Sequence, residues 1–208
     1  GNSYSEGVGA YIVDAVKASG GEMVAQEQCQ DADTDFRAQL SNISSKSPDV
    51  LFIVLTDYSK IALVAQQARE LGMTCQFMGT DGWDSGELAA AANGALEGSY
   101  YLSRIGFNSE NAATFGKRYQ EVYKIDLEGE CLFGYDGVMW IVDALKRANS
   151  ADPVAVRDAL EATDTFEGLI GTLIMDSATH NPAMDCAIYT CKDGAFQFAD
   201  IIKYADLK

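Results

Sequence analysis

The sequence predicts an α/β fold built on a parallel sheet. Six consecutive apolar residues at 50–55 lack the alternation of a half-exposed strand, which is typical of a strand that helices cover on both faces. Amphipathic helical patterns precede and follow this run. The chain of 208 residues is 48% hydrophobic with only 3 prolines, so it can bury a sizeable core. Its length allows one large unit or two small lobes.

Three amphipathic helices are expected in the first part of the chain. Ser3 or Ser5 caps the first helix, and the segment 33–35 caps the second. Ser59 caps the third helix, which ends at Gly72. The second helix is expected to bury three apolar side chains at helical spacing, Phe36, Leu40 and Ile43.

Strands are expected between these helices. In addition to the apolar run at 50–55, short strands are predicted at 23–25, 75–78 and 94–103. The order of helices and strands is that of a repeated unit with right-handed crossovers. It therefore predicts a doubly wound sheet.

The pattern changes after residue 109 and is wholly helical up to residue 163. Asp152-Pro153 is typical of a helix start within this region. Strand patterns return at 169–175 and 187–198, where Lys192-Asp193-Gly194 indicates a hairpin turn. This order suggests that the chain leaves one lobe, contributes helices to another, and returns.

The charge balance excludes some classes of partner. Acidic residues outnumber basic ones by 31 to 15, and the formal net charge is −16. Such a surface repels polyphosphates, so we expect no nucleic-acid partner. No basic amphipathic stretch favours an anionic membrane surface. The apolar run at 50–55 is far shorter than the roughly 20 residues that span a bilayer.

The cysteines and acidic residues give no metal or cofactor signature. The 5 cysteines form no CxxC pair, and we expect them to be mostly buried free thiols. Cys186 and Cys191 would lie roughly 17 Å apart on one strand, too far for a disulfide. The spacing of Asp81, Asp84 and Glu87 lacks the oxygen-rich pattern of a calcium loop.

The usual catalytic sets are also missing from the sequence. His180 is the only histidine and lies in a turn-like stretch. The sequence contains no nucleophile elbow, zinc-protease motif or phosphate-binding glycine loop. Paired carboxylates remain able to do acid–base chemistry, so an α/β hydrolytic enzyme is kept as a disfavoured alternative. We therefore expect binding without catalysis.

The loop at 79–84 is the predicted ligand-binding edge. Ligands of open parallel sheets bind outside the carboxyl ends of the strands. Two further loops, at 1–6 and 56–59, are expected at the same edge. An alternative stays open, in which Asp81 and Asp84 are only turn and cap residues and Trp83 fills a gap. The three loops offer carboxylates and aromatic rings for a cationic group and an apolar body: Tyr4, Ser5, Asp57, Tyr58, Asp81, Trp83 and Asp84.

Several segments together resemble the branched-chain amino acid (Leu/Ile/Val) binding proteins of ABC importers. The likeness follows the right order over nearly the whole chain, and the combination is more specific than any one motif. It is carried by Tyr4-Ser5-Glu6-Gly7, Asp33-Thr34-Asp35-Phe36, Gln67-Ala68-Arg69-Glu70-Leu71-Gly72, Met78-Gly79-Thr80-Asp81-Gly82-Trp83-Asp84-Ser85, Tyr135-Asp136 and Phe166-Glu167-Gly168-Leu169-Ile170-Gly171.

The resemblance implies a type I periplasmic binding protein fold, with two Rossmann-like lobes that close on an amino acid. Asp81 would accept a hydrogen bond from the ligand's α-ammonium group, and Tyr4 would cover the ligand. Tyr58 or its neighbour Asp57 would match the cleft tyrosine of the family. Trp83 would shape the cleft.

The resemblance also implies that this chain is the C-terminal part of a longer protein with a signal peptide. Residues 1–104 and 176–208 would form most of the second lobe, and 105–175 the helical part of the first. These helices would expose an apolar face that favours a homodimer.

The resemblance further implies the partners and the location of the parent protein. The implied partners are a small amino acid and a membrane permease, and the implied location is periplasmic or extracellular, as a membrane-anchored lipoprotein. A ligand-binding sensor domain of a receptor is the alternative, because receptors share this binding fold.

Overall fold

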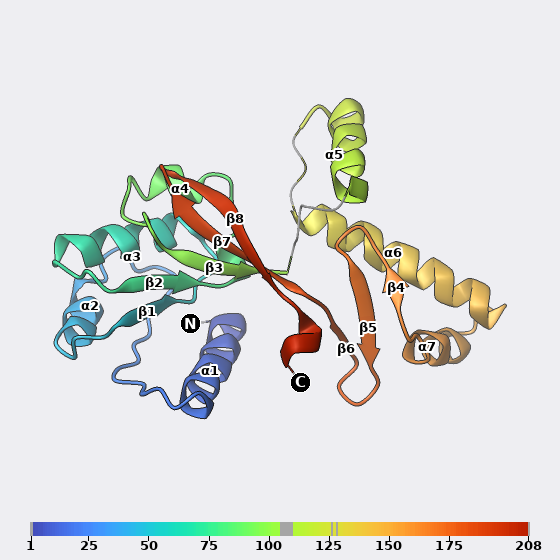
Figure 1. Cartoon of the computed structure of the whole chain (residues 1–208), viewed down its shortest axis with the longest axis horizontal. Coiled ribbons are helices and arrows are strands. Elements are labelled where there is room, and N and C mark those ends of the chain that lie inside the picture. The colour runs from blue at the N-terminus through green and yellow to red at the C-terminus, as the bar shows by residue number, and fades with distance from the viewer. Residues whose placement is uncertain (1, 105–109, 126, 128, 208) are drawn as a thin grey trace. The chain divides into compact units, whose positions relative to one another are not determined.

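The chain folds into two compact units, each described here by itself. The computed structural model describes residues 2–104, 110–125, 127 and 129–207. One unit comprises residues 1–102 and 188–199, and the other comprises 103–187 and 200–208 (Figure 1). The segment 176–187 thus groups with the helical unit, whereas the sequence-based division placed it with the sheet. The expected helical start at 105–109 lies outside the described residues, and the assignment of the units to lobes stays a prediction.

The first unit contains a five-stranded sheet with a parallel part, as predicted. Its strands run in the order β1-β2-β3-β7-β8. β1 pairs with β2, and β2 with β3, in parallel registers. The expected fold class is therefore confirmed. The strand bounds are β1 Val50–Ile53, β2 Gln76–Gly79, β3 Tyr100–Ser103, β7 Cys186–Lys192 and β8 Ala195–Ile202.

Helices and one 3-10 turn connect these strands. α3 packs against α2, α4 and η1 (Figure 1). It buries a continuous apolar stripe because its alanine, valine and isoleucine side chains recur every three or four residues. The bounds are α1 Ser3–Ala18, α2 Arg37–Ser44, α3 Tyr58–Glu70, η1 Asp81–Trp83 and α4 Leu88–Ala91.

The caps of α1 and α3 differ from those predicted. Asn2, not Ser3 or Ser5, caps α1 and accepts a hydrogen bond from the Ser5 amide. Asp57, not Ser59, caps α3 and accepts from both the amide and the hydroxyl of Ser59. The prediction was wrong because a cap needs an extended backbone and a side-chain oxygen aimed at the next turn, and Asn2 and Asp57 supply both.

Two strand predictions also change. No strand forms at 23–25, and β3 begins only at Tyr100 because turns occupy 94–98. A strand requires a neighbour to pair its N–H and C=O groups, and none of the described strands runs beside 23–25. The apolar residues of this segment therefore did not suffice to make it a strand.

The hairpin predicted at Lys192-Asp193-Gly194 joins β7 to β8. Asp193 and Gly194 have φ values of 54° and 75°, which are those of a two-residue turn of the mirror-image kind. The Glu97 carboxylate accepts hydrogen bonds from both turn amides, at 2.9 and 3.3 Å. This side chain thus fastens the end of the hairpin to the segment before β3.

None of the five cysteines forms a disulfide, as predicted, and their burial is lower than predicted. Cys191 is buried, but Cys29, Cys75, Cys131 and Cys186 are partly exposed. Desolvation raises the pKa of the Cys191 thiol, which is inward-facing on β7. It is therefore a weak nucleophile.

The second unit consists of three helices and a small sheet. Antiparallel pairing joins β4 to β5 and β5 to β6. Asp152 caps α7 with Pro153 at its first position, as predicted. The bounds are α5 Glu110–Tyr123, α6 Gly129–Ala148, α7 Pro153–Glu161, β4 Phe166–Glu167, β5 Thr172–Asp176 and β6 Asn181–Ala183.

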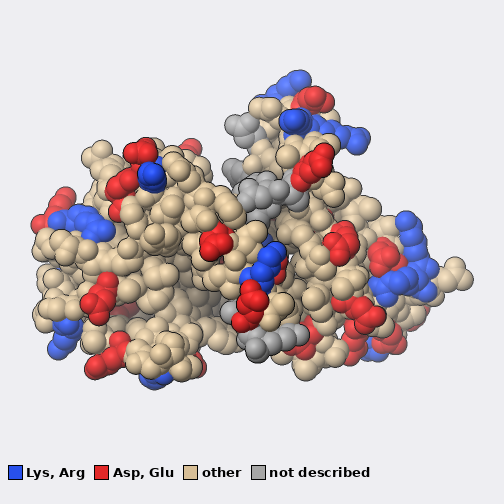
Figure 2. All heavy atoms as spheres, viewed as in Figure 1, with Lys and Arg blue, Asp and Glu red and all other residues tan. Residues whose placement is uncertain are grey.

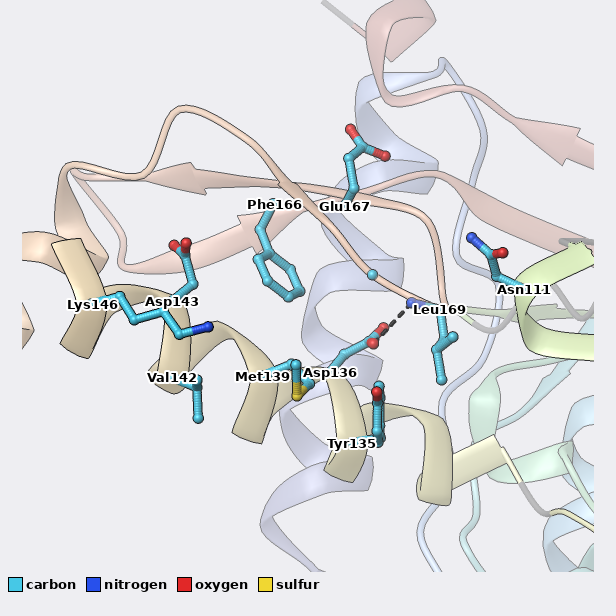
Figure 3. A pocket seen from close by; sticks show the side chains of 11 residues that line it. Asn111, Tyr135, Asp136, Met139, Val142, Asp143, Lys146, Phe166, Glu167 and Leu169 are labelled. Carbon is cyan, nitrogen blue, oxygen red and sulfur yellow. Dashed lines mark hydrogen bonds between the residues drawn. The ribbon is translucent and has the colours of Figure 1, made fainter. Parts of the chain in front are cut away.

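A buried carboxylate fixes the loop between β4 and β5 to α6. Asp136 is only 2% exposed, and it accepts hydrogen bonds from the Leu169 and Ile170 amides at 2.8 and 2.9 Å (Figure 3). The two amides supply the polar partners that a buried carboxylate requires. A Cβ atom on Gly168 would lie 2.3 Å from an Asp136 oxygen, so only glycine fits beside it.

The opposite side of α6 is apolar and exposed. Val138 is 60% exposed and Ile141 is 48% exposed, although the helix buries Leu132, Trp140 and Ala144 on its other side. A helix that is apolar on several sides is usually covered by other parts of a protein. Within the described ranges, no helix combines the length and hydropathy needed to cross a membrane.

Charged side chains are spread over the surface. On the face shown in Figure 2, acidic side chains are dispersed among neutral ones, and basic side chains lie in small separate groups. The described part of this face therefore offers no broad basic surface, as the net charge of −16 predicts.

Substitution of Gly168 by alanine is expected to destabilise the second unit by about 1–3 kcal/mol, because the new methyl group displaces the Asp136 carboxylate. Urea unfolding measures this change. Gly137→Ala is the matched control: nothing lies within 4 Å of its Cβ position on α6, so it should leave stability unchanged or raise it by up to about 1 kcal/mol. Equal effects of the two substitutions would contradict the assignment.

Candidate ligand-binding site

The loop that follows β2 lies against the end of β1. β2 ends at Gly79, and the turn η1 follows Thr80. A Cβ atom on Gly82 would lie 2.2 Å from the Leu55 carbonyl oxygen, so the backbone of the loop approaches the chain after β1 very closely. Two neighbouring parallel strands therefore bring their carboxyl ends together here, at the edge where ligands of such sheets bind.

Trp83 holds this loop from within the core. Its side chain is fully buried, and its indole N–H donates to the Ile53 carbonyl at 2.9 Å. The ring lies 6.3 Å from the Tyr101 ring and 6.2 Å from the Phe196 ring. A Cβ atom on Gly79 would lie 2.1 Å from the indole. The side chain thus occupies the gap that the alternative interpretation expected it to fill.

The structure brings Tyr4 and Asp81 together from distant parts of the sequence. The Tyr4 phenol donates a hydrogen bond to Asp81 Oδ1 and lies 2.9 Å from Thr80 Oγ1. Desolvation raises the pKa of Tyr4, and the hydrogen bond to Asp81 raises it further. Tyr4 is therefore a neutral phenol at physiological pH. This contact joins the start of α1 to the end of β2.

Asp57 and Tyr58 lie at the start of α3, where their partners are Ser59 and Glu87 rather than Tyr4 or Asp81. The hydrogen bond from the Ser59 hydroxyl lowers the pKa of Asp57, and the Ser59 amide lowers it further. Tyr58 is 37% exposed. Its hydrogen bond with Glu87 raises the pKa of its phenol. Both side chains follow β1, so they belong to the same edge of the sheet as the 79–84 loop.

Three further residues of this edge were not predicted from the sequence. Thr80 contacts Tyr4, Glu87 contacts Tyr58, and the Tyr101 phenol donates to Asp84 Oδ1 at 3.4 Å. Burial raises the pKa of Tyr101, so this phenol also stays neutral. The position of Thr80, directly after a strand and before Asp81, is the one sequence signal that could have identified it.

The metal and catalytic alternatives gain no support from the geometry. Among the described residues, no three histidine, cysteine or acidic side chains are grouped so that they could hold a metal. His180 lies in the turn between β5 and β6, 3.8 Å from Glu161, and belongs to the other unit. Neither observation connects it with Tyr4 or Asp81.

A pocket of about 380 Å³ lies in the second unit, and none of the predicted site residues lines it. Tyr135, Met139 and Val142 of α6 form one wall, and Phe166 and Leu169 form the other (Figure 3). The buried carboxylate of Asp136 and the charged side chains of Asp143, Lys146 and Glu167 also line this pocket. None of these lining residues belongs to the loops predicted to bind the ligand.

The first unit thus has the parallel sheet, with loops gathered at the carboxyl ends of its strands, that is typical of open α/β folds that bind small ligands. The chain belongs to the periplasmic binding protein family, whose model matches residues 1–195. The family resemblance inferred from the sequence motifs is therefore confirmed.

Relatives of this chain are named for amino-acid binding. A leucine-, isoleucine-, valine-, threonine- and alanine-binding protein of Pseudomonas aeruginosa is 29% identical over 192 residues, which are 89% of this chain and 50% of that protein. A leucine-specific-binding protein of Salmonella typhimurium is 24% identical over 174 residues, which are 83% of this chain and 47% of that protein. The chain thus spans about half the length of the relatives it matches.

Solved structures agree with these relatives. The leucine-binding protein LivK of Thermotoga maritima superposes with a TM-score of 0.87 at 29% identity, over 99% of this chain and 59% of that chain. LivJ of Streptococcus pneumoniae, in complex with isoleucine, has a TM-score of 0.79 at 26% identity, over 97% of this chain and 57% of that chain. The second of these is a substrate-binding protein of a branched-chain amino acid transporter.

The Asp57 cap is expected to stabilise α3 in a pH-dependent manner. Its folded-state pKa is lowered, so its contribution is full above the unfolded carboxyl value near ~3.9 and is lost as the pH falls through the folded pKa. Asp57→Ala should cost about 0.5–2 kcal/mol at pH 7. In urea unfolding, this deficit should shrink below pH ~4.

Asp14→Ala is the control for the cap, because Asp14 is exposed on α1 and should change stability by less than about 0.5 kcal/mol. A deficit of Asp57→Ala that is the same at all pH values would contradict the role of the ionised cap.

Proposed function

We propose that this chain is part of a solute-binding component of an ABC importer that binds a branched-chain or other amino acid. The observation that carries the proposal is the Tyr4–Asp81 contact at the carboxyl end of β2 in a member of this family. Relatives named for leucine, isoleucine and valine binding support the ligand class. The ligand would bind between this edge and the first lobe, of which the 208 residues would include only the helical part.

Each site residue has a proposed role. Asp81 accepts a hydrogen bond from the ligand's α-ammonium group, because an ionised carboxylate is the strongest acceptor for it. Tyr4 lies beside Asp81 and covers the ligand. Tyr58, or its neighbour Asp57, contributes from the adjacent strand end. Trp83 shapes the site by supporting the loop from beneath, since its side chain is fully buried.

We further propose that the parent protein binds its ligand without transforming it and passes it to a membrane permease outside the cytoplasm, where a lipid anchor retains it. The characterised relatives are binding proteins, which supports this role. A turnover screen across amino acids and peptides tests it, because consumption of any substrate would revive the enzyme alternative.

Substitution of Asp81 by alanine is expected to weaken amino-acid binding by the full-length protein about tenfold or more, because a charge-assisted hydrogen bond contributes roughly 1.5–3 kcal/mol. Calorimetry with leucine measures this loss. Asp49→Ala is the control, since Asp49 is exposed just before β1 and contributes only its backbone carbonyl to the sheet. Unchanged affinity of Asp81→Ala would exclude the ammonium assignment.

The 208-residue chain alone should bind leucine weakly or not at all, because it would lack most of the first lobe.

The exposed side of α6 is expected to make the isolated chain dimerise. Val138 and Ile141 are apolar and exposed, and contact with a second copy would remove them from water. Sedimentation velocity should show a dimer that dissociates when Val138 and Ile141 are both changed to glutamate. Val154→Glu is the control, because Val154 is 54% exposed on α7. A monomer at every concentration would contradict the expectation.

A further inference from the structure

The Tyr4 phenol is the centre of a hydrogen-bond chain at the start of the binding loop. It donates to Asp81 Oδ1 and lies 2.9 Å from Thr80 Oγ1, where either hydroxyl can be the donor. A phenol has one proton to donate. Because that proton points to Asp81, the Thr80 hydroxyl donates to Tyr4 in this arrangement.

The direction of this chain can be reversed without moving a heavy atom. Rotation of the two O–H bonds lets Tyr4 donate to Thr80 Oγ1, since a threonine hydroxyl both donates and accepts. Asp81 Oδ1 then loses the phenol proton, and one lone pair of the Tyr4 oxygen is released. Two acceptors thereby become available side by side for an incoming donor.

A primary ammonium group fits this pair of acceptors. It carries three N–H bonds and can donate to the Asp81 carboxylate and the Tyr4 oxygen at the same time. The phenol cannot leave Asp81 without another acceptor, because a partly buried O–H that loses its partner costs free energy. Thr80 Oγ1, at 2.9 Å, is that acceptor.

We propose that Thr80 is a positioning residue that takes the Tyr4 proton when ligand binds, so that Asp81 and Tyr4 hold the ammonium group together. The proposal rests on the amino-acid site described above and adds a specificity to it. The site favours ligands whose cationic nitrogen carries at least two N–H bonds. An N,N-dimethylated amino acid has one such bond and cannot satisfy both acceptors.

The hydrogen-bond chain can be tested on the 208-residue chain without ligand. NMR of protein labelled at the tyrosine Cζ carbon follows the ionisation of Tyr4, whose resonance is identified by its loss in Tyr4→Phe. Thr80→Val should raise the Tyr4 pKa, because the hydrogen bond from Thr80 lowers it, and Asp81→Asn should lower it. Thr80→Ser should leave it unchanged. A Tyr4 pKa that is the same in Thr80→Val would overturn the proposal.

The role in binding is tested by calorimetry of the full-length protein with L-leucine and with N,N-dimethyl-L-leucine. Loss of one neutral hydrogen bond should make Thr80→Val bind leucine roughly three- to tenfold more weakly, while Thr80→Ser binds it normally. The ratio of the two affinities should fall in Thr80→Val, since the dimethylated ligand does not use the second acceptor. An unchanged ratio would overturn the proposal.

The result also separates this inference from the proposed function. If the wild-type protein binds no amino acid, the function itself fails, and the Tyr4 titration still decides whether the hydrogen-bond chain exists. If leucine binds but Thr80→Val binds it equally well, only the role of Thr80 fails. Thr80→Ala is a second variant that removes the same hydroxyl, should the valine substitution prevent folding.

Discussion

The burial of Trp83 is the constraint on which the binding edge depends. Its indole fills the space beneath the end of β2 and bonds to the backbone of β1, so it fixes the loop relative to two strands at once. Gly79 and Gly82 are needed because the indole and the Leu55 carbonyl leave no room for a Cβ atom. The position of Asp81, between these two glycines, therefore depends on this packing together with the indole hydrogen bond.

The sequence predicted those parts of the fold that follow from hydrophobic pattern. The apolar run before Leu55 and the stripe of α3 identified the parallel sheet correctly, because burial on both faces and helical spacing leave clear signatures. The strand predicted at 23–25 was wrong, because a strand must pair with a neighbour and the local sequence pattern does not reveal whether one is present. The caps of α1 and α3 were predicted at the wrong residues, because several polar residues lie close together there and only the backbone geometry selects Asn2 and Asp57.

The sequence predicted which residues belong to the site more readily than it predicted which of them contact each other. Asp81 and Tyr4 are 77 positions apart. The strand-end rule placed their loops at one edge, and the family resemblance gave each a role, but neither predicted that the two side chains contact each other. The contacts of Thr80 and Glu87 could not be predicted from the sequence, because they depend on which phenol lies within reach. Gln67 shows the same limit: its buried amide bonds to the backbone of Thr34 and Phe36, which no periodic pattern indicates.

The hairpin fastened by Glu97 has a consequence for how the chain is made. The sheet unit needs β7 and β8, yet both strands follow the helices of the second unit in the sequence. A ribosome therefore releases these helices before the first unit can complete its sheet. Until then β3 presents an unpaired edge, which is a site for aggregation. β7 and β8 thus complete a sheet whose parallel strands are synthesised well before them.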